Sequence, residues 1–137
     1  MIPGSSVTAR WLAAGDSGDL DAFDDLMHDD VVVHAPAGLS TTGRDAEKQV
    51  WREALAALQG LTHEIQEILI DGDTEMARVI VTGTIVGDLG TVTTEATGSR
   101  RRFTLDQAVI CHLREGRIAE AWEIADVAAL LASPPRD

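Results

Sequence analysis

The spacing of apolar residues changes once along the chain, and this change limits the fold more than any other feature. Before residue 60 apolar side chains recur every three or four positions, which predicts amphipathic helices. After residue 60 they alternate with polar residues, which predicts strands with one buried face. Helices followed by an antiparallel set of strands predict an α+β domain, with helices covering one face of a curved sheet. Such a sheet leaves a cavity at its open end, where a ligand can bind.

The first part of the chain predicts helices around one short strand. Ser5 or Ser6 can cap a first helix that Gly15-Asp16 ends. A second short helix covers residues 20–27, and the β-branched segment Val31–His34 predicts a strand. The longest helix is expected over Gly43–Gln59, before Gly60. Its apolar stripe consists of Val50, Trp51, Leu55, Ala56 and Leu58.

The second part predicts a meander of strands joined by tight turns. Gly72-Asp73 and Glu115-Gly116 supply the turn residues. Gly87–Ser99 is rich in Gly and Thr and predicts either a strand extension or a flap. Asp126 can cap a last short helix that reaches Leu131. The strands are expected at Thr62–Ile70, Met76–Val86, Phe103–Leu113 and Arg117–Ile124.

The charge of the chain limits its partners. The formal net charge is −12, and a field of that sign repels phosphate backbones and anionic lipid. We therefore expect neither nucleic acid nor a membrane as partner. The basic run Arg100–Arg102 is a local exception, either an anion site or the solvated end of a hairpin. No apolar segment is long enough to span a bilayer, and Met1–Ser6 does not resemble a secretory signal.

The sequence contains few residue patterns that would bind a metal or a cofactor or form a reactive thiol. The four histidines show no paired ligand spacing, and no glycine-rich phosphate loop follows a strand. We therefore expect no metal and no cofactor. The single cysteine, Cys111, lies in an apolar segment and predicts a buried, inert thiol. One unpaired cysteine favours the reducing cytoplasm.

An ordered set of motifs along the chain resembles the SnoaL-like polyketide cyclases of the nuclear transport factor two-like superfamily. The resemblance extends over about residues 7–132, so we expect residues 1–137 to form a single domain. The motifs are Asp29–Pro36, Gly43-Arg44, Gly72-Asp73 with Arg78, Thr82–Thr84 and Glu115–Asp126.

This resemblance implies a cone-shaped α+β barrel, with helices on one strongly curved, mostly antiparallel sheet, and a homodimer formed through sheet surfaces. It also implies ring closure by intramolecular aldol chemistry without metal or cofactor. Epoxide hydrolases and ketosteroid isomerases of similar fold place carboxylates in an apolar pocket. The fold therefore leaves the reaction open.

Glu123 is the first candidate for a catalytic residue. It falls where the resemblance places a catalytic Asp, so a Glu departs from the pattern. On a strand it shares a face with Ala119 and Ala121, which leave space for a ligand and little to hydrate the carboxylate. Burial would raise its pKa towards neutrality, as a general acid–base requires. Asp126 is a competing carboxylate, although capping the last helix is a sufficient role for it.

His34 and Arg78 are candidates for stabilising a substrate oxygen, and the alternative for His34 is a hydrogen-bonded structural histidine. Val32 and His34 share a strand face, which predicts that they reach the interior and that Val33 does not. Arg78 lies mid-strand among apolar residues, so its charge is either paired, facing a cavity or exposed. In the epoxide hydrolases an Asp follows such an Arg by two residues, but here that position is Ile80. An Asp-Arg-Asp relay is therefore incomplete.

The remaining candidates would contact the substrate. Alternation along Phe103–Leu113 leaves two choices of inner face, and we favour the one that includes Gln107, whose amide could hold an enolate oxygen. Trp11, Phe23 and Trp51 lie on helices and either cover the cavity or form ordinary core.

Together these residues predict cofactor-independent acid–base catalysis on a small apolar carbonyl compound. For the SnoaL-like polyketide cyclases that the chain resembles, this reaction is closure of a ring in a polyketide intermediate. Two alternatives remain: an epoxide hydrolase or isomerase of the same fold, and a non-catalytic module for binding small molecules or for dimerisation.

Overall fold

The computed structural model describes residues 6–87 and 101–127. The helices are α1 (Val7–Ser17), α2 (Phe23–Leu26) and α3 (Arg44–Ala57), with short 3-10 helices η1 (Leu20–Ala22) and η2 (Pro36–Gly38). The strands are β1 (Met27–His34), β2 (Ser40–Thr42), β3 (Leu58–Asp71), β4 (Thr74–Ile85), β5 (Arg101–Arg114) and β6 (Arg117–Ala125).

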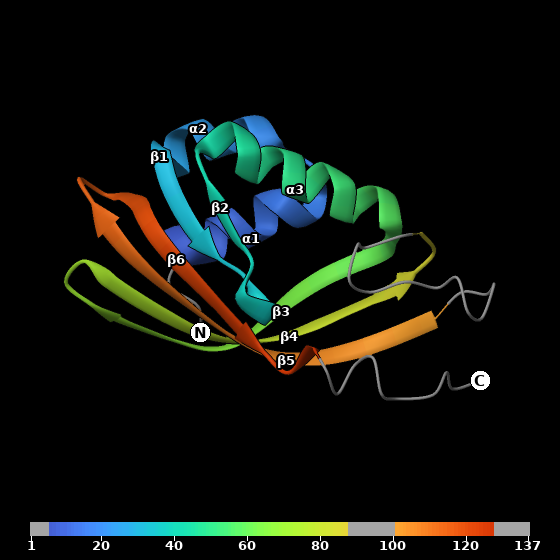
Figure 1. The fold of residues 1–137 in the computed structure, drawn as a ribbon. Helices are drawn as coiled ribbons and strands as arrows, with labels where there is room; N and C mark the ends of the chain where they lie inside the picture. Colours follow the sequence, from blue (N-terminus) through green and yellow to red (C-terminus); the bar gives the residue numbers. More distant parts are fainter. Residues whose placement is uncertain (1–5, 88–100, 128–137) are drawn as a thin grey trace.

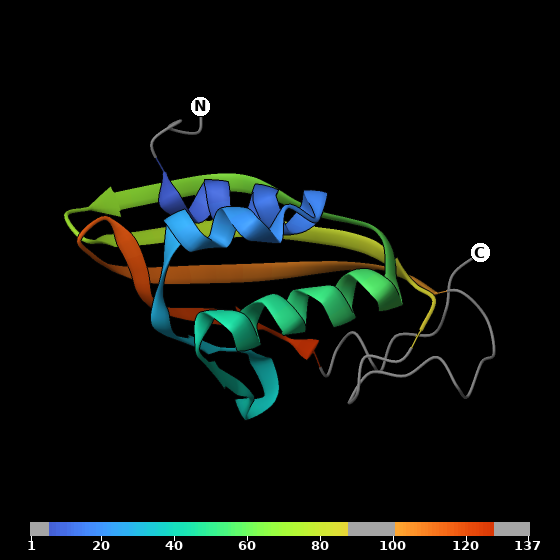
Figure 2. The ribbon, with the colours of Figure 1, turned by 90° about the horizontal axis from the view of Figure 1, so that it is seen from above.

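The described strands form one sheet in the order β2-β1-β6-β5-β4-β3. Strand β1 pairs with β6 in parallel, and the other pairings within the described ranges are antiparallel. The sheet curves without closing, and α1, α2 and α3 lie across its concave face (Figure 1). The view from above shows α3 and the α1–α2 pair side by side on that face (Figure 2). The predicted α+β architecture with a mostly antiparallel sheet is confirmed.

Both predicted tight turns are present. The β3–β4 hairpin turns at Gly72, which has a φ of 58°. The β5–β6 hairpin turns at Glu115 and Gly116, with φ values of 54° and 78°. Glycine adopts this left-handed region without a steric penalty because it lacks a Cβ atom, so glycine identifies such turns in a sequence.

Helix α1 is held at its first turn by a residue from the sheet. Ser6 caps the helix, and its Oγ accepts a hydrogen bond from the Ala9 amide at 3.1 Å. The buried carboxylate of Glu75 on β4 accepts hydrogen bonds from the Ser6 hydroxyl at 3.1 Å and from the Thr8 amide at 2.8 Å. A carboxylate at a helix N-terminus also interacts favourably with the helix dipole. Strand β4 therefore fixes where α1 lies.

The end of α1 differs from the prediction. The helix continues through Gly15 to Ser17, and Gly18 takes the left-handed conformation with a φ of 78°. Gly15-Asp16 therefore does not end the helix. Gly15 is glycine for a different reason, because a Cβ atom there would lie 2.4–2.6 Å from three ring atoms of Trp51 on α3.

Replacing Gly15 with Ala should destabilise the protein. Trp51 is buried, with Trp11 and Phe23 packed edge-on around it, so its ring has little room to move away from a new methyl group. We expect the free energy of unfolding to fall by about 1–3 kcal/mol, although alanine is the better helix former. Urea titration followed by circular dichroism measures the change.

The exposed Ala13 of the same helix supplies a control. Ala13→Gly should cost only the difference in helix propensity, about 1 kcal/mol. A Gly15→Ala variant as stable as the wild type or more stable would contradict the steric explanation.

Other boundaries also differ from the predictions. Met27 begins β1 instead of ending a helix, because it pairs with Ile118 of β6. Helix α3 ends at Ala57, and Leu58 already pairs with Ile85 as the first residue of β3. Val50 is exposed and does not join the buried stripe of α3. The short edge strand β2 was not predicted, since its polar residues are extended only through pairing with β1.

The core lies between the three helices and the face of the sheet that they cover, which we call the inner face. On β5 the inner face contains Gln107, Val109 and Cys111, as favoured above. Cys111 is fully buried, and burial raises the pKa of its thiol to about 12, so it is unreactive. The opposite, outer face of the sheet carries no helix in the described part of the chain.

Some predictions fall on residues that the structure does not describe. These are the stretch after Gly87, Arg100 of the basic run and the last helix beyond Val127. Within residues 6–87 and 101–127, no helix has the length and apolar character needed to cross a membrane.

Candidate functional site

Glu123 lies on the inner face of β6, beneath the helices. It pairs with Val109 of β5, and its neighbour on the same face, Ala121, is fully buried. The Glu123 side chain is partly buried, and this burial raises its pKa to about 7, while the nearby His63 acts in the opposite direction. A carboxyl group with a pKa near neutrality can accept and return a proton under ordinary conditions.

A second carboxyl group, Glu47, is buried within electrostatic range of Glu123. It projects from α3 and is only 1% exposed. The indole Nε1 of Trp51 donates a hydrogen bond to Glu47 Oε2 at 3.0 Å, whereas Oε1 has no partner among the described residues. Burial and the charge of Glu123 raise the pKa of Glu47 to about 8, against the effect of the Trp51 hydrogen bond.

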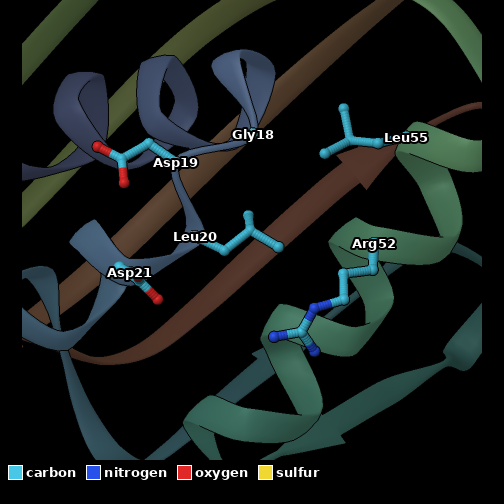
Figure 3. A pocket seen from close by; sticks show the side chains of 6 residues that line it. All are labelled: Gly18, Asp19, Leu20, Asp21, Arg52 and Leu55. Atoms are coloured by element: carbon cyan, nitrogen blue, oxygen red, sulfur yellow. The ribbon is translucent and has the colours of Figure 1, made fainter.

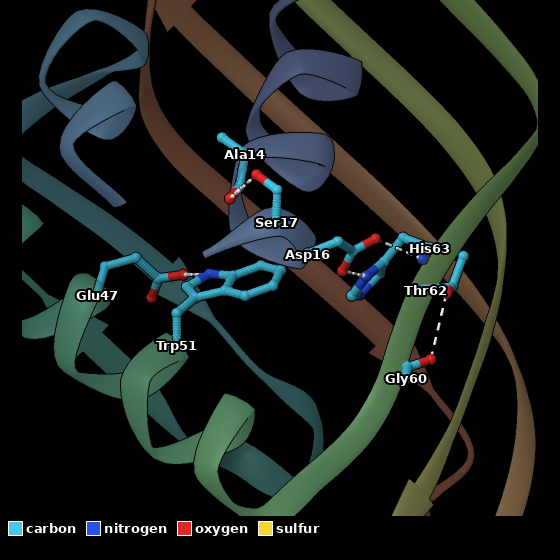
Figure 4. A network of polar contacts seen from close by, with 8 residues as sticks. All are labelled: Ala14, Asp16, Ser17, Glu47, Trp51, Gly60, Thr62 and His63. Carbon is cyan, nitrogen blue, oxygen red and sulfur yellow. Dashed lines mark hydrogen bonds and ion pairs between the residues drawn. The ribbon is translucent and has the colours of Figure 1, made fainter. Parts of the chain in front are cut away.

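An acid–imidazole pair lies on the other side of the Trp51 ring. The ring centroids of Trp51 and His63 are 5.5 Å apart. Asp16 of α1 accepts hydrogen bonds from the His63 ring Nδ1 at 2.6 Å and from the His63 amide at 2.7 Å (Figure 4). With Asp16 as acceptor, Nδ1 carries the proton and the ring is held in one orientation. Both side chains are largely buried, at 9% and 17% exposed.

We call Asp16, Glu47, Trp51, His63 and Glu123 the interior cluster. Its members come from α1, α3, β3 and β6, so only the complete fold brings them together. Glu123 interacts electrostatically with both Glu47 and His63. Two carboxyl groups whose pKa values are raised by burial, here Glu47 and Glu123, are typical of an active site.

The aromatic residues predicted to cover the site pack together on the helices. Phe23 and Trp11 are fully buried, and each meets the Trp51 ring edge-on, with centroids 6.0 and 6.4 Å apart. Trp51 belongs to the interior cluster, whereas the other two form core around it. Gln107 is buried on the inner face, and its Oε1 atom has no partner in the described ranges.

The prediction that His34 and Val32 face the interior is wrong. Val33, not Val32, is buried, because Val33 pairs with the inner-face residue Ala121. His34 therefore points to the outer face. Its Nε2 lies 2.7 Å from Glu120 Oε2, and its ring stacks on Trp122 with centroids 5.3 Å apart. The structure does not bring His34 to Glu123.

Arg78 is also on the outer face. Its guanidinium lies 3.1 Å from a Glu67 carboxylate oxygen and 3.6 Å from one of Asp106, and its side chain is 51% exposed. The register Arg78–Ala108–Ile124 puts it on the opposite side of the sheet from Glu123. Arg78 therefore cannot polarise a carbonyl held by the interior cluster, and no relay is assembled around it there.

Asp126 is exposed directly after β6. Beyond Val127, the helix that it was predicted to cap lies outside the described residues.

The sequence contained signals for the residues that were missed. Glu47 precedes Trp51 by four positions, so a carboxyl group lies on the buried stripe of a helix. His63 alternates with Leu61 and Ile65, which marks it as an inner-face residue. Asp16 gives no comparable local signal, because its partner is far away in the sequence.

The structure also contains an open surface pocket of about 400 Å³ (Figure 3). It lies between the end of α1, η1 and α3, and it includes no residue of the interior cluster and no residue predicted for the site. Its lining residues are Gly18, Asp19, Leu20, Asp21, Arg52 and Leu55.

Comparisons with known proteins agree with this fold. The family model for SnoaL-like polyketide cyclases matches residues 6–133. No curated protein matches the chain significantly.

Many solved structures are similar. IdmH from Streptomyces antibioticus, a candidate polyketide cyclase, is 27% identical with a TM-score of 0.76, over 92% of this chain and 94% of its own. A candidate SnoaL-like polyketide cyclase from Jannaschia sp. CCS1 is 15% identical with a TM-score of 0.80, over 93% and 91%. An LEH-like epoxide hydrolase of M. tuberculosis is 20% identical with a TM-score of 0.66, over 89% and 81%. The last two similarities concern the fold alone.

Proposed function

This chain belongs to the SnoaL-like polyketide cyclase family, and we propose that it closes a ring in a polyketide-type intermediate by acid–base catalysis without a cofactor. The observation that carries the proposal is the interior cluster. Glu123 lies on the inner face with a pKa raised to about 7 by burial, beside further titratable groups.

The proposed reaction begins with Glu123 as the base. Its carboxylate removes a proton from the carbon next to a substrate carbonyl, and the C–H electron pair forms an enolate. The enolate carbon then attacks a second carbonyl of the same molecule, forming the new C–C bond. The resulting alkoxide takes the proton back from Glu123, so the enzyme returns to its starting state.

His63 has a supporting role in this proposal. Asp16 holds its ring at 2.6 Å, and its positive form would favour the charged form of Glu123, since His63 lowers the Glu123 pKa. His63 therefore adjusts how easily Glu123 gives up its proton.

Two other functions are less well supported. A non-catalytic binding module does not require titratable groups that converge in the interior, where burying them costs free energy. Epoxide hydrolysis through an Asp-Arg-Asp relay requires Arg78 beside an inner carboxylate, but Arg78 lies on the exposed outer face.

Proton removal can be tested without knowing the natural substrate. The probe is 2-tetralone, a small apolar ketone, and ¹H NMR in D₂O follows deuterium incorporation next to its carbonyl. The proposal predicts faster exchange with protein than with buffer alone. Exchange at the buffer rate, together with hydrolysis of a simple epoxide such as styrene oxide, would favour the hydrolase alternative instead.

We further propose that the protein is a homodimer formed through the outer face of the sheet. Leu69, Met76 and Ile124 are 69%, 44% and 56% exposed there, which is unusual for large apolar side chains on a sheet. Paired register positions extend this apolar surface across neighbouring strands, as Leu69–Met76–Ile110–Trp122. A second copy would cover the same surface on both partners.

Replacing Ile124 with Lys should convert such a dimer to a monomer, because it places a charge within the apolar surface. Sedimentation velocity measures the mass. Gln49→Lys adds the same charge on the exposed side of α3, which covers the opposite face of the sheet, and should leave the dimer intact. A wild-type protein that sediments as a monomer at every concentration would contradict the proposal.

We place the reaction in the cytoplasm and in secondary metabolism. The buried, unpaired Cys111 is compatible with a reducing compartment.

A further inference from the structure

Glu47 has one satisfied and one unsatisfied carboxyl oxygen, although the residue is almost completely buried. Trp51 Nε1 donates to Oε2 at 3.0 Å, so Oε2 is the accepting oxygen. Oε1 is buried and makes no hydrogen bond within residues 6–87 and 101–127. In native proteins a buried polar atom without a partner is uncommon and requires an explanation.

The surroundings of Glu47 favour its neutral form. Glu123 on β6 adds a negative charge, and the His63–Asp16 pair lies beyond the Trp51 ring. The adjacent Lys48 does not compensate, because its Nζ pairs with Asp24 on α2 at 2.7 Å. Burial of an uncompensated carboxylate is costly, so its pKa rises to about 8 and the group keeps its proton at neutral pH.

The Trp51 hydrogen bond determines where this proton lies. Because Oε2 accepts from the indole, the neutral acid carries its hydrogen on Oε1. Oε1 is therefore a hydrogen-bond donor in a dry environment, without an acceptor among the described side chains. A carboxylic acid kept neutral by its surroundings can stabilise a developing oxyanion through such a donor.

We propose that Glu47 is a second catalytic residue, which donates its Oε1 hydrogen to the carbonyl oxygen of the molecule whose adjacent C–H is deprotonated by Glu123. This inference rests on the proposed function and extends it to the substrate class. The substrate is an uncharged ketone or diketone that presents its carbonyl oxygen to Glu47 and its acidic C–H to Glu123. When the C–H bond breaks, the proton goes to Glu123 and the enolate oxygen is held by the Glu47 hydrogen bond. Trp51 acts as a positioning residue, because it selects the oxygen that carries the hydrogen.

The variants Glu47→Gln and Glu47→Leu separate this role from a structural one. In Glu47→Gln the amide oxygen can accept from Trp51, which leaves its NH₂ group as a donor at the Oε1 position. We expect this variant to keep exchange of 2-tetralone within about threefold of wild type at pH 7, and to retain it at higher pH where the wild-type acid ionises. Glu47→Leu has a similar volume but no donor, and should lower exchange by about a hundredfold.

Two measurements do not depend on turnover. The first is a ¹³C NMR titration of the glutamate carboxyl carbons, in which one protonated signal should persist through neutral pH and disappear in Glu47→Gln. In Glu123→Gln that signal should remain and titrate at lower pH, because the neighbouring charge is gone. The second is calorimetric binding of 2-naphthol, a planar mimic of the tetralone enol, which should weaken about tenfold in Glu47→Leu and little in Glu47→Gln.

The outcomes distinguish this inference from the proposed function. If Glu123→Gln abolishes exchange while Glu47→Leu exchanges and binds 2-naphthol like wild type, the role of Glu47 is wrong and the proposed function stands. An ordinary acidic pKa for Glu47 also contradicts its proposed role as a hydrogen-bond donor. The same holds if the wild-type protein does not bind 2-naphthol at concentrations up to the solubility limit of 2-naphthol. If Glu123→Gln leaves exchange unchanged, the proposed function fails, whatever the titration reports for Glu47.

Discussion

Replacing Glu123 with Gln is expected to lower the rate of proton exchange from 2-tetralone between about a hundredfold and ten-thousandfold, the usual contribution of a positioned general base. Gln has nearly the same shape as Glu but cannot take up a proton. Since Glu123 is partly buried on the inner face and its environment disfavours the charged form, an amide should fit there without unfolding the protein. The exchange rate and the circular dichroism spectrum of the variant test both statements.

Glu120 provides a matched control on the same strand. It lies on the outer face, where its carboxylate contacts His34, and its side chain is 41% exposed. Glu120→Gln makes the same chemical change on the opposite side of the sheet and should leave exchange unchanged. Equal rates for Glu123→Gln and wild type, or equal losses for both variants, would remove Glu123 from the role of base.

The free energy of unfolding should fall as pH rises from about 4.5 to about 8, and Glu47→Gln should remove most of this dependence. The folded protein holds the Glu47 proton up to a pKa of about 8, whereas the unfolded chain releases it near the ordinary value of 4.5. Below pH 4.5 Glu47 is protonated in both the folded and the unfolded state, so its contribution to the free energy of unfolding is fully present there. Between the two values only the unfolded state has released the proton, so stability is progressively lost as pH rises.

The size of this effect is large, because Glu47 is almost fully buried. A pKa raised from 4.5 to about 8 corresponds to a loss of about 5 kcal/mol across the transition. Glu47→Gln should therefore be more stable than wild type at pH 9 and similar to it at pH 4. Glu123, with its own raised pKa, contributes in the same direction and keeps some slope in the variant.

Urea denaturation at several pH values measures the slope. Glu53→Gln on the exposed side of α3 is the control, since this carboxylate is exposed and should leave the slope of the wild type unchanged. A Glu47→Gln variant whose stability follows the wild-type slope would show that Glu47 is not a buried acid that retains its proton.

The order of helices and strands was predictable because it depends on local patterns. Alternation along residues 117–125 placed Glu123 with Ala121 on one face, and the structure has them together on the inner face. Glycine-containing turns located both hairpins. These features are determined by neighbouring residues, so the sequence alone contains them.

Which face of a strand turns inward was not predictable where both faces are apolar. Val31–Val33 has no alternation, so the orientation of β1 depends on its pairing with β6, where Val33 meets Ala121. The same applies to Arg78, whose side is set by its register with Ala108. His34 was assigned to the interior, and the side of Arg78 was left open, because these long-range pairings cannot be read locally.

The interior cluster could be predicted only in part. Glu123 was identified by its place on the last strand, but Glu47 becomes a buried acid only when α3 lies over the sheet. Its high pKa comes mainly from this burial and also from the charge of Glu123, a residue 76 positions later (123 − 47). The pairing of His63 with Asp16 likewise requires α1 to lie beside β3.

The parallel pairing of β1 with β6 affects the order in which the protein can assemble during translation. Strand β6 lies between β1 and β5 in the sheet. Strands β1 and β2 therefore cannot join the other strands until β6 has left the ribosome. The hairpin β3–β4 can form earlier, because its partners are adjacent in the chain. The ribosome must therefore release nearly all of the described chain before Glu123 meets Glu47, and until then β1 remains available to chaperones.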